Sequence, residues 1–400
     1  MSLSDSFKGW IASTPVLRAG FGVLRSVLPV AKFGKTVVVT RYKDVMEVLV
    51  RESDFTVHEI DGYKMERMGN PFVLGMDASP ETTRDRQMLH QVITGKDLLL
   101  VRDLITKIAA ELIAQARPKK KIDVVDEYAR LASVRFVAQY FGVPADEQKM
   151  MWWQRSIFNE AFANLSDNKA IRERGMAAAK EIADYLATLI TERKKQQEPL
   201  PDNVLNRLIK KQKDNDWLDD NAVRRNILCI LGVVENTSKV VTHVIDQLLR
   251  HPERMEKVRQ AVFNNDIQTV HDYSFEALRF NPHNPVILRY CKNGSVIGQG
   301  TRRERKIPAG STVYAATLSA MFDPEVVINP KTFDPDRKVE YMHFGYGPHL
   351  CTGRYISEVT VPELVAGLLR LPGLRRAEGS AGRIVYENLV FPKSLTLNFD

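Results

Sequence analysis

The spacing of apolar residues along the chain predicts a long helical region between two parts that contain strands. Residues 36–40 (TVVVT) are rich in β-branched side chains and predict a strand. The next segment carries Val45, Val48 and Leu49 on one face of a helix. Between about 81 and 260 the pattern is almost wholly helical, and short polar or proline-containing breaks such as 196–202 separate the amphipathic runs.

After Asn281 the pattern changes to short strands and turns, as in residues 294–300 and 307–314, and a helix resumes at about Tyr355. The chain has no internal repeat, no low-complexity segment and no linker long enough to separate domains. We therefore expect a mainly α fold with a minor β part, in one large domain over residues 1–400. Its parts would be a β-containing segment at about 30–75, a helical part at about 81–280, and a β and cysteine-loop part at about 281–400.

Charge narrows the choice of partners only slightly. The 400 residues carry a formal net charge of +8, which suits nucleic acid, an anionic membrane or an acidic protein. The basic clusters at 117–121 (RPKKK) and 302–306 (RRERK) lack interleaved aromatic residues and any nucleic-acid motif. We interpret them as solvated surface and expect no nucleic-acid binding.

The apolar N-terminus is interrupted by Arg18, Arg25 and Lys32 well before roughly 20 uncharged residues accumulate. We therefore expect neither a transmembrane segment nor a cleavable signal. Residues 10–33 are interpreted as a packed N-terminal arm, with weak peripheral contact to a membrane surface as the alternative.

Three cysteines lie far apart in the sequence, at Cys229, Cys291 and Cys351. They form neither a disulfide framework nor a zinc-binding pattern, which indicates a reducing cytoplasm. Cys229 lies in an apolar run and is expected in the core. Cys291 follows an expected strand and is assigned no function.

Cys351 belongs to the segment FGYGPHLCTG (344–353), just ahead of the last helix. A thiolate at a helix N-terminus is stabilised by the helix dipole and by free backbone N–H groups. Without side chains, Gly345, Gly347 and Gly353 would let the backbone turn sharply and approach a flat macrocycle. The alternative is a glycine-rich turn with a spare cysteine.

The segment resembles, at every specified position, the FGxGxHxCxG signature of the cytochrome P-450 superfamily. The resemblance implies the fold of that family, with haem b (iron protoporphyrin IX) between a central (I) helix and the cysteine-loop helix. Cys351 would be the proximal iron ligand, and Phe344, Gly345 and Gly353 would shape the loop against the haem. Glu276-Ala277-Leu278-Arg279 is similar to the family's ExxR motif, and residues 333–337 (FDPDR) to the segment that brings it a second arginine.

The same resemblance places Arg86, Arg289 and His349 at positions that bind haem propionates, for which guanidinium and imidazole groups are natural partners. One position departs from the family pattern. Residues 80–86 read PETTRDR where bacterial members usually have PEHTRxR, so Thr82 replaces a histidine. We expect one propionate contact to be weakened or lost.

The central helix also departs from the pattern, because the usual AGxETT becomes GVVENT at 232–237. Asn236 takes the place of the threonine that helps to deliver protons to dioxygen. A carboxamide can position water or substrate but cannot act as an acid near neutral pH. Glu235 remains and could pass protons through water. Two alternatives stay open: Thr237 takes over by a small helix shift, or Asn236 bonds to a helix carbonyl.

The resemblance implies an oxidoreductase, by default a monooxygenase that inserts one oxygen atom from dioxygen into an apolar small molecule. Its electrons would come from an acidic ferredoxin or flavodoxin that docks near Arg354. One alternative is an isomerase, dehydratase or peroxygenase that acts on a hydroperoxide without a reductase, since some such members carry asparagine in the I helix. A more remote one is a non-catalytic haem-binding sensor. We expect a cytoplasmic monomer. The substrate pocket would be lined by apolar residues chosen from Tyr63, Met65, Met68, Phe72, Trp152, Trp153, Phe158, Phe162, Ile287 and Phe391.

Overall fold

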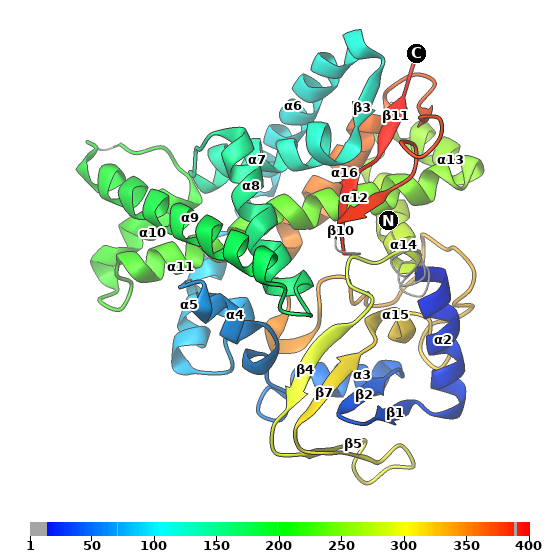
Figure 1. The fold of residues 1–400 in the computed structure, drawn as a ribbon. Coiled ribbons are helices and arrows are strands. Elements are labelled where there is room, and N and C mark those ends of the chain that lie inside the picture. The colour runs from blue at the N-terminus through cyan, green and yellow to red at the C-terminus, as the bar shows by residue number, and fades with distance from the viewer. Residues whose placement is uncertain (1–13, 70, 198, 388–389) are drawn as a thin grey trace. The chain divides into compact units, whose positions relative to one another are not determined.

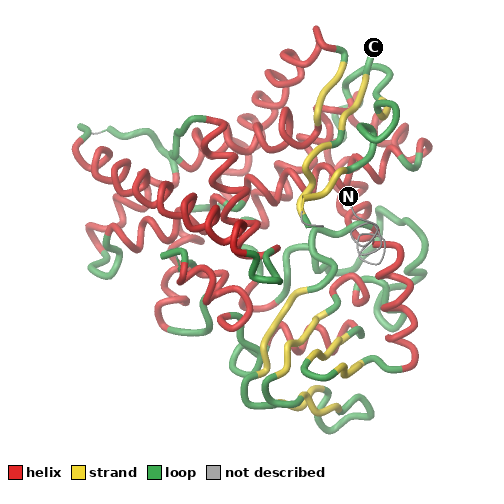
Figure 2. The backbone as a smooth tube through the Cα atoms, viewed as in Figure 1, coloured by secondary structure: helices red, strands yellow, loops and turns green. Residues whose placement is uncertain are grey.

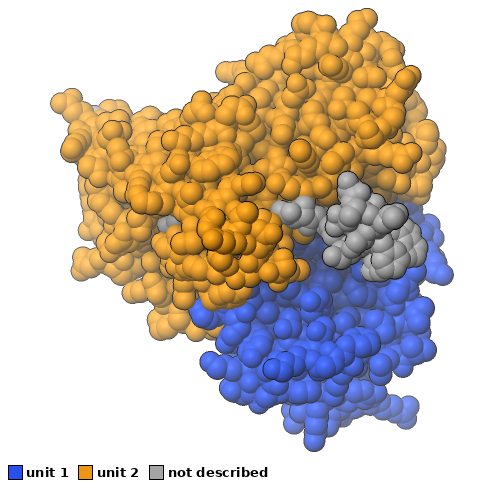
Figure 3. Space-filling model, in the orientation of Figure 1, with its two compact units in different colours: residues 1–60, 275–351 blue, residues 61–274, 352–400 orange. Residues whose placement is uncertain are grey.

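The computed structural model describes residues 14–400 except 70, 198, 388 and 389, and is mainly helical with small sheets (Figures 1 and 2). Trp10 of the expected N-terminal arm lies outside the described residues. The chain divides into two compact units, each assembled from separate stretches of sequence (Figure 3). Unit 1 comprises residues 1–60 and 275–351, and unit 2 comprises residues 61–274 and 352–400. The mainly α architecture with a minor β part is confirmed.

Unit 1 is built on a four-stranded sheet whose strand order is β1-β2-β7-β4. Strand β2 pairs in parallel with β7, whereas β1 with β2 and β4 with β7 are antiparallel. Strands from both ends of the sequence therefore share one sheet. The elements of unit 1 are α2 (Thr14–Val27), β1 (Val30–Phe33), β2 (Thr36–Val39), α3 (Tyr42–Val50), β4 (Ile287–Cys291), β5 (Ser295–Ile297), β6 (Arg305–Ile307), β7 (Ser311–Ala315), α15 (Thr317–Ala320) and η9 (Gly347–His349).

The core of unit 1 follows from the alternation of side chains in these strands. Val37 and Val39 of β2 and Val313 and Ala315 of β7 are fully buried, and Val45 of α3 packs in the same cluster. The predicted strand at 36–40 and the helix after it are confirmed. The N-terminal arm contains the helix α2. Pro15 is tolerated in the first turn of this helix, and Pro29 lies just beyond its end, so neither proline interrupts it.

Unit 2 is mainly helical. Its elements are α4 (Tyr63–Arg67), α5 (Pro80–Val92), α6 (Leu98–Ala116), β3 (Lys121–Asp123), η5 (Val124–Arg130), α7 (Leu131–Phe136), η6 (Val137–Phe141), α8 (Glu147–Phe158), η7 (Asn159–Ala163), α9 (Lys169–Lys195), α10 (Val204–Lys211), α11 (Asp220–Leu231), α12 (Val233–Leu249), α13 (Pro252–Phe263), most of α14 (Ile267–Phe280), α16 (Arg354–Leu369), β8 (Arg375–Arg376), β9 (Val385–Glu387), β10 (Phe391–Ser394) and β11 (Thr396–Asn398).

The centre of unit 2 is the helix pair α11 and α12, which packs against η5, α8, α16 and β10. Among the described residues, the stretch Asp220–Leu249 is long and apolar enough to span a bilayer. However, 83% of its apolar window is buried inside the protein, which is the environment of a core helix. The small sheets β3-β11-β8 and β9-β10 lie in the same unit.

Candidate functional site

The cysteine loop is closed by backbone hydrogen bonds within unit 1. The N–H of Cys351 donates to the carbonyl of Phe344 over 3.0 Å, and the N–H of Leu350 donates to Gly347 over 2.9 Å. Cys351 is half-buried, and α16 begins just after it, at Arg354. The hydrogen bonds therefore hold the backbone of the loop at Cys351, which precedes the 16-residue helix α16 by three positions in the sequence.

Two of the three loop glycines have the conformation expected of them. Gly345 has a φ of 79° and Gly347 a φ of 70°, in the left-handed region that favours glycine. A Cβ atom at Gly347 would also lie 3.1 Å from the backbone of Leu49 and Val50. Gly353 differs, because its φ is −93°, a value open to any residue. Gly345 and Gly347 therefore turn in a conformation that favours glycine, whereas Gly353 lies in a turn that any residue could adopt. The close approach of all three to a haem stays a prediction.

The predicted ExxR pair forms a buried hub in unit 1. Arg279 donates to both carboxylate oxygens of Glu276, at 2.6 and 2.9 Å, and both side chains are fully buried. The same guanidinium donates to the carbonyls of Pro330, Thr332 and Met321. Each donor and acceptor is thus satisfied, which a buried ion pair requires.

Other groups complete this hub from the segment that precedes the cysteine loop. Glu276 accepts the Tyr341 hydroxyl at 2.7 Å and the N–H of Asp334 at 2.9 Å. The Nε of Arg337 lies 3.6 Å from Glu276 Oε1, so the structure brings the second arginine to the pair. The hub connects the end of α14 to the chain that leads to Cys351.

The ring of Phe344, the first residue of the loop, packs against Phe275 with 5.8 Å between ring centroids. His343 Nε2 lies 2.9 Å from the carbonyl oxygen of Phe275. Burial lowers the pKa of His343 to about 4, so this ring is neutral at pH 7 and therefore supports the loop without adding charge.

The three candidate propionate ligands have different surroundings. His349 Nε2 lies 3.0 Å from Glu52 Oε1, so a carboxylate of the protein already occupies that nitrogen. Arg289 on β4 is buried, and its Nη1 donates to the carbonyl of Leu288 at 2.9 Å. Arg86 is half-buried on α5. The propionate roles of all three stay predictions.

Thr82 replaces the family histidine, and its hydroxyl contacts residues that immediately precede α5. It donates to the carbonyl of Asp77 at 2.8 Å and lies 2.8 Å from the Ser79 hydroxyl, at the N-cap of α5. Because this proton is already used, Thr82 does not take over the histidine's donor role.

The central helix is interrupted at Gly232, which ends α11 and precedes α12. A Cβ atom there would lie 2.7 Å from the ring of Phe158, so glycine permits the close approach of α8. Three residues further, Glu235 is 1% exposed and its carboxylate lies 2.8 to 2.9 Å from the guanidinium of Arg130 on η5. Burial raises the pKa of Glu235, and the charge of Arg130 offsets part of that rise.

Asn236 and Thr237 behave differently from the other polar residues of α12. Ser238 and Thr242 donate their hydroxyls to helix carbonyls at 2.9 and 2.6 Å. Within the described part of the chain, the Asn236 carboxamide and the Thr237 hydroxyl have no hydrogen-bond partner in the protein. The alternative that Asn236 bonds to a helix carbonyl is therefore not what the structure shows. Its half-buried carboxamide can instead bind water or a ligand.

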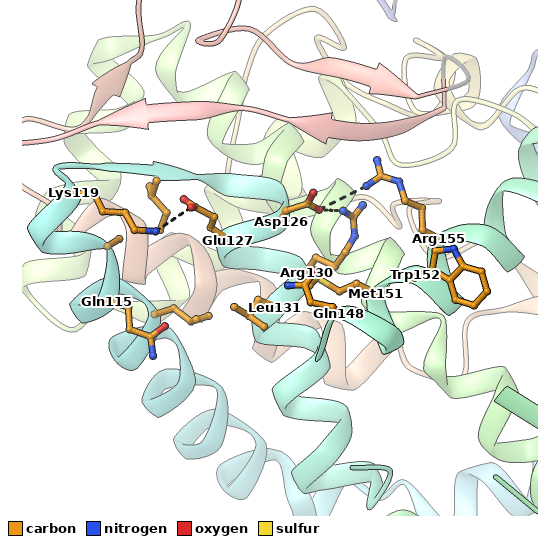
Figure 4. Close-up of a pocket in the computed structure, with 13 residues that line it drawn as sticks. Gln115, Lys119, Asp126, Glu127, Arg130, Leu131, Gln148, Met151, Trp152 and Arg155 are labelled. Carbon is orange, nitrogen blue, oxygen red and sulfur yellow. Dashed lines mark hydrogen bonds and ion pairs between the residues drawn. The ribbon is translucent and has the colours of Figure 1, made fainter. Parts of the chain in front are cut away.

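A surface cavity of about 410 Å³ lies between α6, β3, η5 and α8 in unit 2 (Figure 4). Asp126 at its wall contacts Arg130 and lies 3.7 Å from Arg155. None of the predicted cofactor residues lines the cavity, whereas Arg130, which does, is paired with Glu235. Trp152, expected in a substrate pocket, lines this cavity, whereas Trp153 is buried and packs against Tyr185.

The remaining pocket candidates are divided between the units. Phe158, Phe162 and Phe391 form one aromatic cluster in unit 2, with neighbouring ring centroids 5.1 and 6.1 Å apart. Met65, Met68 and Phe72 are buried in the same unit. Ile287 packs at the core of unit 1. Their role in lining a pocket stays a prediction.

The residues present fit a haem. Among the described residues, no group of three or more His, Cys, Asp or Glu could hold a bare metal ion. A single half-buried thiol would suit a haem, which brings its own four nitrogens and needs one thiolate from the protein. Cys229 and Cys291 are both buried, and burial raises the pKa of the Cys291 thiol, which leaves Cys351 as the candidate ligand.

Comparison with known proteins gives the class directly. The family model described as cytochrome P450 matches residues 31–371. The chain belongs to the cytochrome P450 family, and membership implies a haem and a small-molecule substrate, with a hydroxylase and an epoxidase among its relatives.

Three curated relatives show the range of the family around this chain. A cytochrome P450 of Bacillus subtilis is 27% identical over 363 residues, covering 86% of this chain and 82% of the relative. The 6-deoxyerythronolide B hydroxylase of Saccharopolyspora erythraea is 26% identical over 302 residues, covering 74% and 69%. A bifunctional dioxygenase and epoxy alcohol synthase of Fusarium oxysporum is 26% identical over 313 residues, covering 70% of this chain and 24% of the relative.

The fold agrees with solved structures. The crystal structure of CalO2 superimposes with a TM-score of 0.83 at 23% identity, and the match covers 98% of each chain. The predicted P450 fold is therefore confirmed over nearly the whole chain.

Proposed function

We propose that the protein is a haem-thiolate monooxygenase with haem b on Cys351. One atom of dioxygen would enter a C–H bond of an apolar substrate and the other would leave as water, with two electrons from an external donor. The observation that carries the proposal is the closed cysteine loop of a P450 family member, supported by the similarity to a hydroxylase. A cytoplasmic location stays a prediction.

The haem, when bound through the thiolate, supplies dioxygen activation. The chain's own residues hold and orient it. The hub of Glu276 and Arg279 fixes the segment before the loop, and Gly345 and Gly347 let the loop backbone turn. Arg86, Arg289 and His349 would bind the propionates, with one donor fewer than usual because the Thr82 hydroxyl already donates to the Asp77 carbonyl.

Proton supply would depend on water held by Asn236 and Thr237, whose polar groups have no protein partner within the described residues. Glu235 is held by Arg130, so for it to pass a proton this pair must open. Arg130 also contacts Asp126, whose side chain is half exposed at the surface cavity. When the pair of Arg130 and Glu235 opens, Asp126 therefore remains as a carboxylate for Arg130 to bind.

Electron supply is proposed to come from an acidic ferredoxin or flavodoxin, which the net charge of +8 favours. The Nε of Arg354 lies 2.7 Å from Glu358 and its charge is thereby partly balanced. Docking would therefore depend on several cations and not on Arg354 alone.

A hydroperoxide isomerase is the second candidate, favoured by Asn236 and by the similarity to an epoxy alcohol synthase. One pair of assays on the holoenzyme separates the two. The monooxygenase couples NAD(P)H use to product in the presence of redox partners, and Asn236→Thr keeps or improves that coupling. In the isomerase, Asn236→Ala lowers rearrangement by about 10- to 1000-fold, the loss of one positioned hydrogen-bond donor. Turnover of a fatty-acid hydroperoxide without reductant, and no product in NAD(P)H-driven assays, would overturn the proposal.

A further inference from the structure

Lys239 on α12 is a buried cation to which no described residue offers an anion. It is 4% exposed, and the described residues provide it with neither a hydrogen-bond acceptor nor a carboxylate within ion-pair distance. Its ammonium instead lies over the ring of Phe391, 5.3 Å from the ring centroid. A buried ammonium without an acceptor is costly, so its presence requires an explanation.

The other buried cations all have acceptors. Lys64 is 3% exposed but donates to the carbonyl of Ala161 at 3.1 Å. Arg130, Arg279 and Arg289 donate to Glu235, Glu276 and the Leu288 carbonyl, respectively. Lys239 is thus the exception among the buried lysines and arginines of the described chain.

The nearest carboxylate on the same helix, that of Glu235, is not available to Lys239. Lys239 lies one turn after Glu235, the spacing at which a helical ion pair normally forms, but Glu235 is turned to Arg130. Asn236, three residues before Lys239, borders the same face and is half-buried, so a small molecule can reach this stretch of helix. Phe391 packs against Phe158, which contacts Phe162, and the three rings provide apolar surface beside the ammonium.

We propose that the protein binds an apolar monocarboxylic acid whose carboxylate pairs with the Lys239 ammonium while its hydrocarbon part lies against the aromatic cluster. This names a substrate class for the proposed function and rests on it for turnover. Binding itself does not depend on the reaction type.

The charge state of Lys239 supports this role. Burial lowers its pKa to about 7, and no neighbouring charge contributes. The titratable side chains of α12 itself are Glu235, His243 and Asp246. Those of the elements packed against it are Asp126, Glu127, Tyr128, Arg130, Arg135, Glu147, Lys149, Arg155, Glu253, Arg254, Glu256, Lys257, Arg259, Arg354, Tyr355, Glu358, Glu363 and Lys393. A bound carboxylate would raise the pKa of Lys239, so binding above pH 7 must take up a proton.

The test is calorimetric titration of the resting holoenzyme, without reductant, with decanoic, dodecanoic and tetradecanoic acids and the alcohols of the same chain lengths. We expect the acids to bind about 10- to 100-fold more tightly than the alcohols, the effect of one charge-assisted hydrogen bond in a buried site. Buffer dependence of the heat should give uptake of about 0.9 proton at pH 8 and about 0.1 at pH 6, from a pKa of about 7.

Lys239→Met should abolish both the preference for acids and the proton uptake while leaving alcohol binding unchanged. Lys149→Met is the matched control, because Lys149 also lies 5.3 Å from an aromatic centroid, at Trp153, but is exposed and paired with Glu181. It should behave as wild type. Acids that bind wild type no better than alcohols, or that bind Lys239→Met equally well, would overturn the proposal. Failure of NAD(P)H-driven turnover with acid binding intact would count against the monooxygenase alone.

Discussion

Replacing Arg130 by methionine removes the only cation within ion-pair distance of the buried Glu235 carboxylate among the described residues. Both side chains are 1% exposed, so the carboxylate loses its partner without gaining water. Breaking a buried pair on one side costs about 3–5 kcal/mol. For a chain of 400 residues this corresponds to a fall in Tm of about 4–6 °C.

The loss should depend on pH. Burial already raises the pKa of Glu235, and removal of the Arg130 charge raises it further. A carboxyl group whose folded-state pKa exceeds its unfolded-state pKa is destabilising above the unfolded-state pKa, and the penalty grows as pH rises through the folded-state pKa. The difference between wild type and Arg130→Met should therefore be larger at pH 8 than at pH 5, as measured by urea unfolding of the holoenzyme.

Arg135→Met is the control, since its Nε also lies 2.8 Å from a carboxylate, that of Glu147, but the two side chains are 20% and 43% exposed. Such a partly solvated pair should contribute about 1 kcal/mol or less. Adding Glu235→Gln to Arg130→Met should recover part of the lost stability. An equal loss in both single variants, or a loss independent of pH, would refute the interpretation of the pair.

Three further outcomes are expected. Arg279→Lys cannot reproduce a bidentate pair plus three carbonyl contacts, so it should lower the free energy of unfolding by about 3–5 kcal/mol and reduce haem retention on gel filtration. Gly347→Ala should cost about 1–2 kcal/mol in the left-handed region and reduce haem content, whereas Gly353→Ala should leave the haem content of purified protein unchanged. Reduction by an acidic ferredoxin, followed by stopped flow, should slow as salt rises from about 10 mM to 0.5 M, because the screening length falls several-fold; a rate independent of salt would exclude electrostatic docking.

How much of the site could be predicted depends on how far apart its partners lie in the sequence. Glu276 and Arg279 are three residues apart on one helix, and the loop residues around Cys351 are contiguous, so their resemblance to short family motifs identified them. The pair of Arg130 and Glu235 joins residues 105 positions apart, and no local pattern predicts it.

Other features could not be predicted because burial, backbone conformation and strand pairing depend on residues that are distant in the sequence. Lys239 ends the polar stretch 235–239 (ENTSK), which predicts an exposed lysine, and only the structure shows that its side chain is buried. Gly353 matches the family signature, but its backbone needs no glycine. The strand at 36–40 was predictable from β-branched residues, whereas its parallel pairing with β7 is set by contacts across more than 270 residues.

The central claim, thiolate ligation by Cys351, is tested most directly by the absorption spectrum of the reduced, carbon-monoxide-bound protein. The P450 family membership predicts a Soret band near 450 nm for the wild type, because Cys351 would bind the haem iron as a thiolate. Cys351→Ser should abolish that band, while Cys229→Ser and Cys291→Ser, at buried positions, should keep it. A band near 420 nm in freshly purified, folded wild type, or a 450 nm band that survives Cys351→Ser, would contradict the account.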